Sequence, residues 1–254
     1  MQTHAVIDFM SCVRQIPAAS KPQTFRDIIT SVFDIGNNDR VEMSHIVFDS
    51  YAEKSIKEGE RARRASVKGK IDLVQLTEDT PIPKQVEKFW TSNSNKERLQ
   101  LLVYEVALRD IPNVVVSGIV VNNELIPPMC KGIVSEPDLH ELSNWQEEAD
   151  CRLIAHVNWS VSKGCQRILF FSNDTDTLAL LLRYIDIFER KGLKELWIRF
   201  GKGETKRMIP LHKIKESIGN ELSQSIIKLH VLTGCETTSK IGTKHAALNC
   251  NPLP

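Results

Sequence analysis

The sequence predicts an α/β protein whose central sheet is mostly parallel. Three apolar stretches read as buried strands, and each runs directly into aspartate, at 5–8, 45–49 and 168–176. Segments with helical spacing of apolar residues separate them, and such alternation is typical of parallel sheets. The 41% hydrophobic and 26% charged content is that of an ordinary globular protein. One large α/β domain, or a domain with an appended module, fits 254 residues.

The first half of the chain alternates predicted strands and helices. In order, we expect a strand at 4–8, helices at 9–16 and 25–33, a strand ending at Asp49 and a charged helix at 54–70. The prolines and the Thr/Ser/Asn cluster of 77–98 predict a partly ordered connector. A helix at 99–108 and a strand at 114–121 follow, and Asn122-Asn123 favours a hairpin turn.

The second half repeats this alternation and ends in helices. A helix beginning near Trp145 has a buried face that includes Ala149, Leu153 and Val157, and Lys163-Gly164 ends it. The remaining predicted elements are a strand at 167–172, a leucine-rich helix at 178–188, a strand at 195–200 and a helical pair at 211–218 and 221–232. His156 lies among apolar neighbours and is predicted to be a core histidine rather than a ligand.

Composition excludes several classes of protein. The formal net charge of +1 gives the whole chain no general attraction to polyanions. No apolar run approaches the ~20 residues of a membrane span, and no signal peptide opens the chain. The six cysteines lack the CxxC spacing of zinc sites and fit reduced thiols. We therefore expect an intracellular protein.

The aspartates at the strand ends have two interpretations. Taken singly, Asp8, Asp174 and Asp176 fit turn residues or helix N-caps. Glu148 and Asp150 fit the first turn of a helix, where the helix dipole favours acids. Taken together, the carboxyl ends of parallel strands meet in one crevice, so these groups are expected to lie close to one another.

Clustered carboxylates need protons or cations to neutralise them. Oxygen ligands without a His/Cys set favour Mg²⁺ or Mn²⁺. Two such ions, about 3.5–4 Å apart, would activate a water and stabilise the departing oxygen of a phosphodiester. The pattern therefore predicts metal-dependent phosphate chemistry.

The order of these motifs resembles the flap endonuclease family of PIN-like nucleases, the xeroderma-group-G type, over most of the chain. Ala5-Val6-Ile7-Asp8 and Val47-Phe48-Asp49 resemble its first two metal strands. The family's acid-Ala-acid helix start is similar to 148–150, and its acid-Asp-x-Asp loop is similar to 173–176. The segment 232–236 resembles the element before its helix-two-turn-helix.

The resemblance implies a role for each matching residue. It implies a three-layer PIN-like fold with two Mg²⁺ or Mn²⁺ ions. The implied metal ligands are Asp8, Asp49, Glu148, Asp150, Asp174, Asp176 and Glu236. A Lys-x-Gly-Glu-x-x-x-Arg pattern at 57–64 implies that Lys57 and Arg64 reach the scissile phosphate. Arg61, Arg63, Lys240 and Lys244 are expected to contact DNA.

The chain also departs from the family pattern. Asp150 and Glu236 exchange Asp and Glu relative to the usual set, and Asn173 replaces an acid. We expect a PIN-like domain at 1–210, with a divergent insert at about 65–140, and a partial helix-two-turn-helix element at 211–254. The sequence at 232–239 resembles uncharacterised PIN-like proteins associated with mobile elements in animal genomes more closely than it resembles the repair enzymes of the family.

Three functions remain open on the sequence. The first is a structure-selective nuclease acting on branched or flapped DNA. The second is a catalytically inactive nuclease-like module, derived from a mobile element, that binds nucleic acid or a protein. The third, a haloacid-dehalogenase-type phosphatase with its nucleophile near Asp174, is disfavoured because little chain remains for the downstream lysine and second acidic pair. The basic stretch 54–70 is a phosphate-binding surface, a solvated face or a nuclear-import patch.

Overall fold

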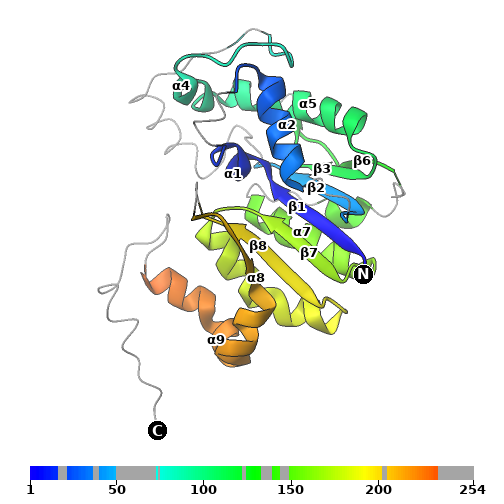
Figure 1. The fold of residues 1–254 in the computed structure, drawn as a ribbon, viewed down its shortest axis with the longest axis vertical. Coiled ribbons are helices and arrows are strands. Elements are labelled where there is room, and N and C mark those ends of the chain that lie inside the picture. Colours follow the sequence, from blue (N-terminus) through cyan, green and yellow to red (C-terminus); the bar gives the residue numbers. More distant parts are fainter. Residues whose placement is uncertain are drawn as a thin grey trace.

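A computed structural model describes the chain at residues 1–16, 22–36, 40–49, 73, 75–121, 124–132, 139–143, 149–201 and 205–233. These residues form a mixed α/β fold in which helices cover both faces of a central sheet (Figure 1). The predicted fold class is confirmed at that level.

The described part of the chain contains a seven-stranded sheet with a parallel centre and antiparallel edges. In spatial order the strands are β6 (Met129–Lys131), β3 (Val114–Ser117), β2 (Met43–Val47), β1 (Thr3–Asp8), β7 (Arg167–Phe171), β8 (Glu195–Phe200) and β9 (Arg207–Pro210). The five strands from β3 to β8 all run in the same direction. Their carboxyl ends therefore lie along a single edge.

The strand order reverses direction beside β1. Strands β2 and β3 lie in sequence on one side of β1. The later strands β7 and β8 lie in sequence on its other side. The gap between the carboxyl ends of β1 and β7 is thus the topological switch point, where open α/β sheets commonly bind ligands.

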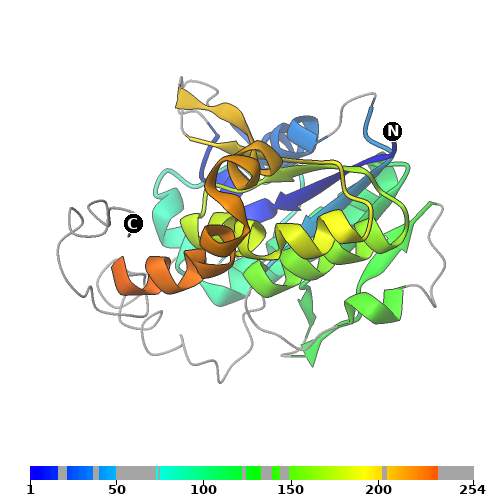
Figure 2. The same cartoon turned by 90° about the horizontal axis from the view of Figure 1, so that it is seen from below.

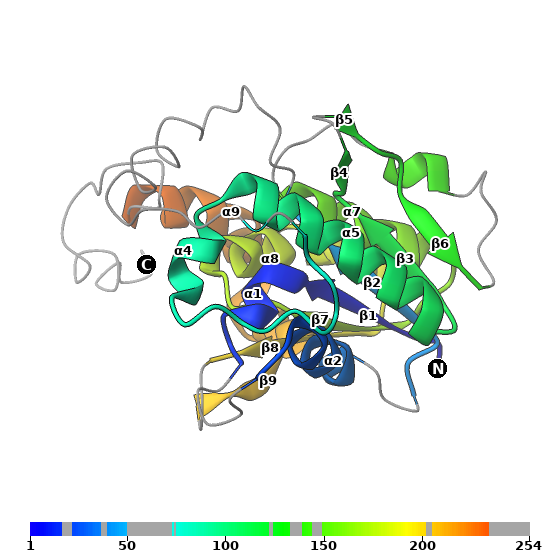
Figure 3. The ribbon, with the colours of Figure 1, turned by 90° about the horizontal axis from the view of Figure 1, so that it is seen from above.

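One face of the sheet is covered by α1 (Phe9–Val13), α2 (Phe25–Gly36), α4 (Val86–Trp90) and α5 (Asn93–Asp110). Alternate residues of β1, Ala5 and Ile7, are buried against this layer because successive strand residues point to opposite faces. α2 begins with a reciprocal pair, in which Thr24 Oγ1 accepts from Asp27 N–H and Asp27 Oδ2 accepts from Thr24 N–H. α4 and α5 follow one another along this layer (Figure 3).

The other face is covered by α7 (Ala149–Ser162), α8 (Thr175–Arg190) and α9 (Leu211–Thr233). Val6 of β1 and Phe170 of β7 are buried on this side. α9 packs against α8, and its C-terminal end lies toward the end of the molecule to which β1 points (Figure 2). The short η2 (His140–Leu142) and the hairpin of β4 (Val120–Val121) and β5 (Glu124–Leu125) complete the described elements.

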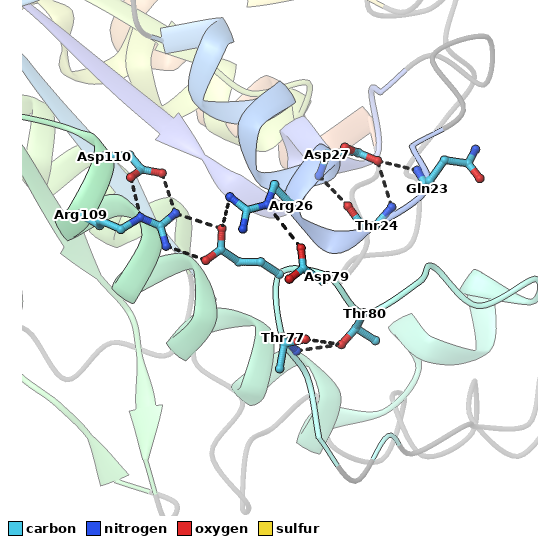
Figure 4. A network of polar contacts seen from close by, with 10 residues as sticks. Gln23, Thr24, Arg26, Asp27, Thr77, Asp79, Thr80, Arg109 and Asp110 are labelled. Carbon is cyan, nitrogen blue, oxygen red and sulfur yellow. Dashed lines mark hydrogen bonds and ion pairs between the residues drawn. The ribbon is translucent and has the colours of Figure 1, made fainter.

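A polar network fastens the segment before α4 to the helices of the first face (Figure 4). Glu78 accepts from Arg109 near the end of α5, at 2.6 Å, and pairs with Arg26 of α2 at 2.9 Å. The Arg109 guanidinium is the main reason why the pKa of Glu78 lies below its usual value. One carboxylate thus ties two helices and a loop together.

Four predicted elements need correction. The connector predicted at 77–98 is helical over most of its second half, because α4 occupies 86–90 and α5 starts at Asn93, with Ser92 as its N-cap. The predicted strand at 114–121 is two strands, separated where Gly118 adopts a φ of 88°. The segment just before α9 is strand β9, which pairs with β8. The predicted helix at 9–16 ends at Val13.

Several other predictions are confirmed. β1, β7 and β8 lie where expected, His156 is fully buried, and α9 contains a break at Gly219 that divides it into the expected pair. β3 and β6 belong to the central sheet, although they fall inside the segment expected to be an insert. The charged helix at 54–70 and the Asn122-Asn123 turn lie outside the described residues, and the division at 210 stays a prediction. Over the described ranges, no helix is long and apolar enough to cross a membrane.

Candidate metal centre

Asp8 lies at the switch point and is the last residue of β1. Its Oδ1 accepts from the Ser11 N–H at 2.9 Å, which makes it the N-cap of α1. Its Oδ2 accepts from the Ser172 hydroxyl at 3.1 Å. Since Ser172 follows β7 directly, this second bond joins the ends of the two strands that border the switch point.

Asp49 and Asp150 lie where α7 begins. Asp49 follows β2, and its Oδ1 accepts from the Ala149 N–H at 3.0 Å. Asp150 Oδ1 accepts from the hydroxyl of buried Thr177 at 2.6 Å. The first turn of α7 is therefore held between the end of β2 and the first turn of α8.

Asp174 and Asp176 occupy the loop from β7 into α8. Asp174 is the N-cap of α8, with its Oδ1 accepting from the Asp176 N–H at 2.9 Å. Asp176 Oδ1 lies 2.6 Å from Nε2 of His230, which belongs to α9. The Asn173 amide oxygen accepts from the Gly201 N–H at 2.8 Å, so the loop is also tied to the end of β8. The capping interpretation is thus correct for both Asp8 and Asp174.

Electrostatic interactions connect the five proposed metal ligands that the structure describes, which are Asp8, Asp49, Asp150, Asp174 and Asp176. Burial raises the pKa of Asp8 to about 7, and the negative charges of Asp49 and Asp150 add to the shift. Burial likewise raises the pKa of Asp150 to about 6, with further contributions from Asp174, Asp49 and Asp176. These carboxylates therefore share one region, in which negative charge accumulates at a free-energy cost.

Part of the predicted site cannot be placed. The residues that fall outside the described ranges are Lys57, Arg61, Arg63, Arg64, Glu148, Glu236, Lys240 and Lys244. Within those ranges, no group of three or more His, Cys, Asp or Glu side chains is close enough together to hold one metal ion. The two-ion site stays a prediction.

The chemistry of the donors nevertheless fits a divalent cation. The donors are carboxylate oxygens, and Asp49, Asp150 and Asp174 each use one oxygen in a hydrogen bond to a described residue. The second oxygen of each has no hydrogen-bond donor among those residues. No described lysine or arginine forms an ion pair with the five aspartates. Hard cations prefer such oxygen ligands.

Four residues of the centre were not predicted from the sequence. Ser11, Ser172 and Thr177 orient carboxylates or the loop, and His230 contacts Asp176. Ser172 and Thr177 flank the acidic loop in the sequence, so their polar side chains were an available signal. His230 is distant in the sequence and carries no local signal, because only the packing of α9 on α8 brings it near.

Comparisons with known proteins give no relative. No family model matches the chain, and no curated protein and no solved structure matches it. Any function proposed for the chain therefore depends on the site itself.

Proposed function

We propose that the chain is a divalent-metal-dependent nuclease that hydrolyses phosphodiester bonds in DNA. The proposal rests on one observation: aspartates from β1, the end of β2, α7 and the β7–α8 loop meet at the carboxyl edge of a parallel sheet, at its switch point. Burial raises the pKa values of Asp8 and Asp150, and the negative charges of their neighbours add to the shift, which is the condition that a bound cation relieves.

The ligands proposed for two Mg²⁺ or Mn²⁺ ions are Asp8, Asp49, Asp150, Asp174 and Asp176, with Glu148 and Glu236. Bound there, the ions would supply the positive charge that lowers the pKa of an attacking water and stabilises the departing oxygen. By resemblance, Lys57 and Arg64 would hold the scissile phosphate, and branched or flapped DNA would be the substrate.

The chain's own residues position these carboxylates. Thr177 donates to Asp150, Ala149 N–H donates to Asp49, and Ser172 donates to Asp8. Each bond fixes one carboxylate oxygen, and for Asp49 and Asp150 it leaves the other for a cation. A rigid sheet edge with fixed oxygens is the kind of arrangement that a metal-dependent hydrolase needs.

The test is cleavage of labelled single-stranded, duplex, 5′-flap and hairpin DNA in Mg²⁺ and in Mn²⁺. The double variant Asp174→Asn/Asp176→Asn should lower the cleavage rate by at least about a hundredfold, because asparagine is a much weaker ligand. Asparagine caps helices as well as aspartate does, so α8 should remain folded. The control is Asp34→Asn, an exposed position on α2, which should cut at the wild-type rate.

The inactive module is the second candidate, and the contact of His230 with Asp176 favours it. That contact occupies one proposed ligand, and the described residues do not gather three ligands around one point. Calorimetric titration with Mn²⁺ separates the two functions. If folded protein neither releases heat on titration with Mn²⁺ nor cuts DNA, the nuclease proposal is overturned in favour of the inactive module.

A further inference from the structure

Arg199 has an unusual environment for a guanidinium group. It lies on β8, paired with Phe171 of β7 and Met208 of β9. The guanidinium carbon lies 5.3 Å from the centre of the Phe171 ring. Its Nε and Nη2 atoms are buried and have no hydrogen-bond partner within the described part of the chain. Burial lowers the pKa of Arg199. Leaving charged donors unpaired costs several times what a satisfied hydrogen bond contributes.

A second cation, Lys206, lies beside Arg199. Its ammonium donates to the neutral carbonyl of Gln15 at 3.0 Å. The pKa of Lys206 is lowered by burial and then by the positive charge of Arg199. No carboxylate in the described ranges forms an ion pair with either side chain. Two neighbouring cations without a counter-charge among the described residues favour the binding of an anion.

There is space for such an anion at this end of the sheet. A hollow of about 570 Å³ is lined by Phe200, Gly201, Thr205, Lys206 and Arg207. Gly201 has a φ of 102°, and a Cβ there would lie 2.4 Å from the Thr205 carbonyl oxygen, so the turn that shapes the hollow requires glycine. Arg207 adds a second positive charge to the lining, beside that of Lys206.

The hollow adjoins the acidic loop. Gly201 N–H donates to the side chain of Asn173, the residue directly before Asp174. On the other side, Gln15 donates to the Ser11 hydroxyl, which accepts from the Asn173 N–H. Cations and carboxylates thus lie next to one another on the same edge of the sheet.

We propose that Lys206 and Arg207, with the positive charge of Arg199 beside Lys206, bind a backbone phosphate of the nucleic acid strand whose neighbouring phosphodiester lies at the acidic loop. The proposal rests on the proposed nuclease function for the identity of the strand. Phosphate oxygens accept several N–H donors at once and need no donor from the ligand, which suits a guanidinium and an ammonium without acceptors. A phosphate bound in the hollow would place negative charge beside Lys206 and so relieve its repulsion by Arg199.

The test measures binding of a fluorescein-labelled 12-nucleotide single strand by anisotropy at several NaCl concentrations. All proteins carry Asp174→Asn/Asp176→Asn, so that the probe is not cut. Adding Lys206→Gln/Arg207→Gln should raise Kd at least about fivefold and reduce the slope of log Kd against log salt by about 0.7 for each phosphate that the protein no longer neutralises. The matched control is Lys194→Gln, an exposed lysine just before the amino end of β8, which should change neither quantity.

Arg199→Gln provides an independent variant, to be used after circular dichroism shows that it is folded. It should also weaken binding. Unchanged Kd and slope in folded Lys206→Gln/Arg207→Gln and Arg199→Gln would overturn the inference. If Lys206→Gln/Arg207→Gln instead lost binding of inorganic phosphate while keeping the Kd and slope for the probe, the site would be one for the free anion, and the assignment to backbone phosphate would be overturned.

The same set of variants distinguishes a failure of this inference from a failure of the proposed function. If wild-type protein does not cut DNA in Mg²⁺ or Mn²⁺, but the pocket variants still lose binding, the nuclease proposal fails and the phosphate site stands. If wild-type protein cuts and the pocket variants bind and cut like it, the phosphate site alone fails.

Discussion

At the scale of single residues, the site aspartates have a structural role alongside the proposed chemical one. Asp8 and Asp174 each cap a helix, and Asp49 and Asp150 hold the start of α7. An aspartate at a strand end is therefore explained without any metal. The two roles differ in what they require, because capping needs one oxygen acceptor whereas a cation needs a negative charge.

Substitutions of Asp174 separate these roles. Asp174→Asn keeps an acceptor for the Asp176 N–H, so the free energy of unfolding should stay within about 0.5 kcal/mol of wild type. Asp174→Ala removes the cap and should lower it by about 1 kcal/mol. Both variants should lose cleavage, since neither carries the charge. Urea denaturation and a cleavage assay on the same preparations check this, and cutting by folded Asp174→Ala would show that Asp174 is not a ligand.

At the scale of elements, the sequence predicted those whose apolar pattern is clear. Strands β1, β7 and β8 and helices α2 and α8 have continuous or periodic apolar residues. The first turns of α5 were missed because 93–98 is polar, and tertiary contacts stabilise it there. Asn95 is fully buried, accepts from Leu73 N–H and donates to the Phe89 carbonyl. β9 was missed because four residues ending in proline carry little strand signal, and pairing with β8 decides its conformation.

The end of β3 depends on a single glycine. At Gly118, φ is 88°, and a Cβ would lie 2.1 Å from the Phe48 carbonyl oxygen and 2.8 Å from Arg152 Nη1. These two groups are hydrogen-bonded to each other beside Asp49. Gly118→Ala should therefore displace the end of β2 as well as strain its own backbone.

We expect Gly118→Ala to lower the free energy of unfolding by about 3 kcal/mol. Gly192→Ala is the matched control, since its φ is 110° but nothing lies within 4 Å of a Cβ there. It should cost about 1 kcal/mol from backbone strain alone. Equal losses for the two variants, measured by urea denaturation, would show that the close approach at Gly118 contributes nothing.

At the scale of the whole molecule, topology explains why the grouping of the aspartates at one edge could be predicted in outline. Acids after apolar strands can be recognised in the sequence, and a parallel sheet brings them to one edge. Which groups complete that edge depends on long-range contacts that no local pattern encodes: the packing of α9 on α8 for His230, and the pairing of β8 with β7 for Arg199. The same holds for a histidine cluster in the core. His4 and His45 lie on adjacent strands, and α7 places His156 and Ser160 against them.

This histidine cluster stays neutral in the folded protein. Burial lowers the pKa of His4 to about 4 and that of His156 to about 3, and it lowers the pKa of His45 well below 6.5, with smaller contributions from its histidine neighbours. In the unfolded chain these groups bind protons below about pH 6.5. Between these values the unfolded state holds more protons, so the free energy of unfolding rises with pH in this window and is lost as the pH falls. Asp8 and Asp150, with raised pKa values, oppose part of this loss.

Acid should therefore lower the free energy of unfolding because the buried histidines gain protons only when the protein unfolds. The variant His4→Gln should reduce this effect. Removing one such histidine should reduce the slope of unfolding free energy against pH by about 1.4 kcal/mol per pH unit between about pH 6 and pH 4.5. Above pH 7 the slopes of variant and wild type should coincide, because histidine is then neutral in both states. Urea denaturation from pH 4.5 to 8 measures the slopes, and NMR of the imidazoles follows their protonation directly. Parallel slopes at low pH, or imidazoles of all three residues that gain protons near pH 6.5 while the protein is folded, would contradict a neutral buried cluster.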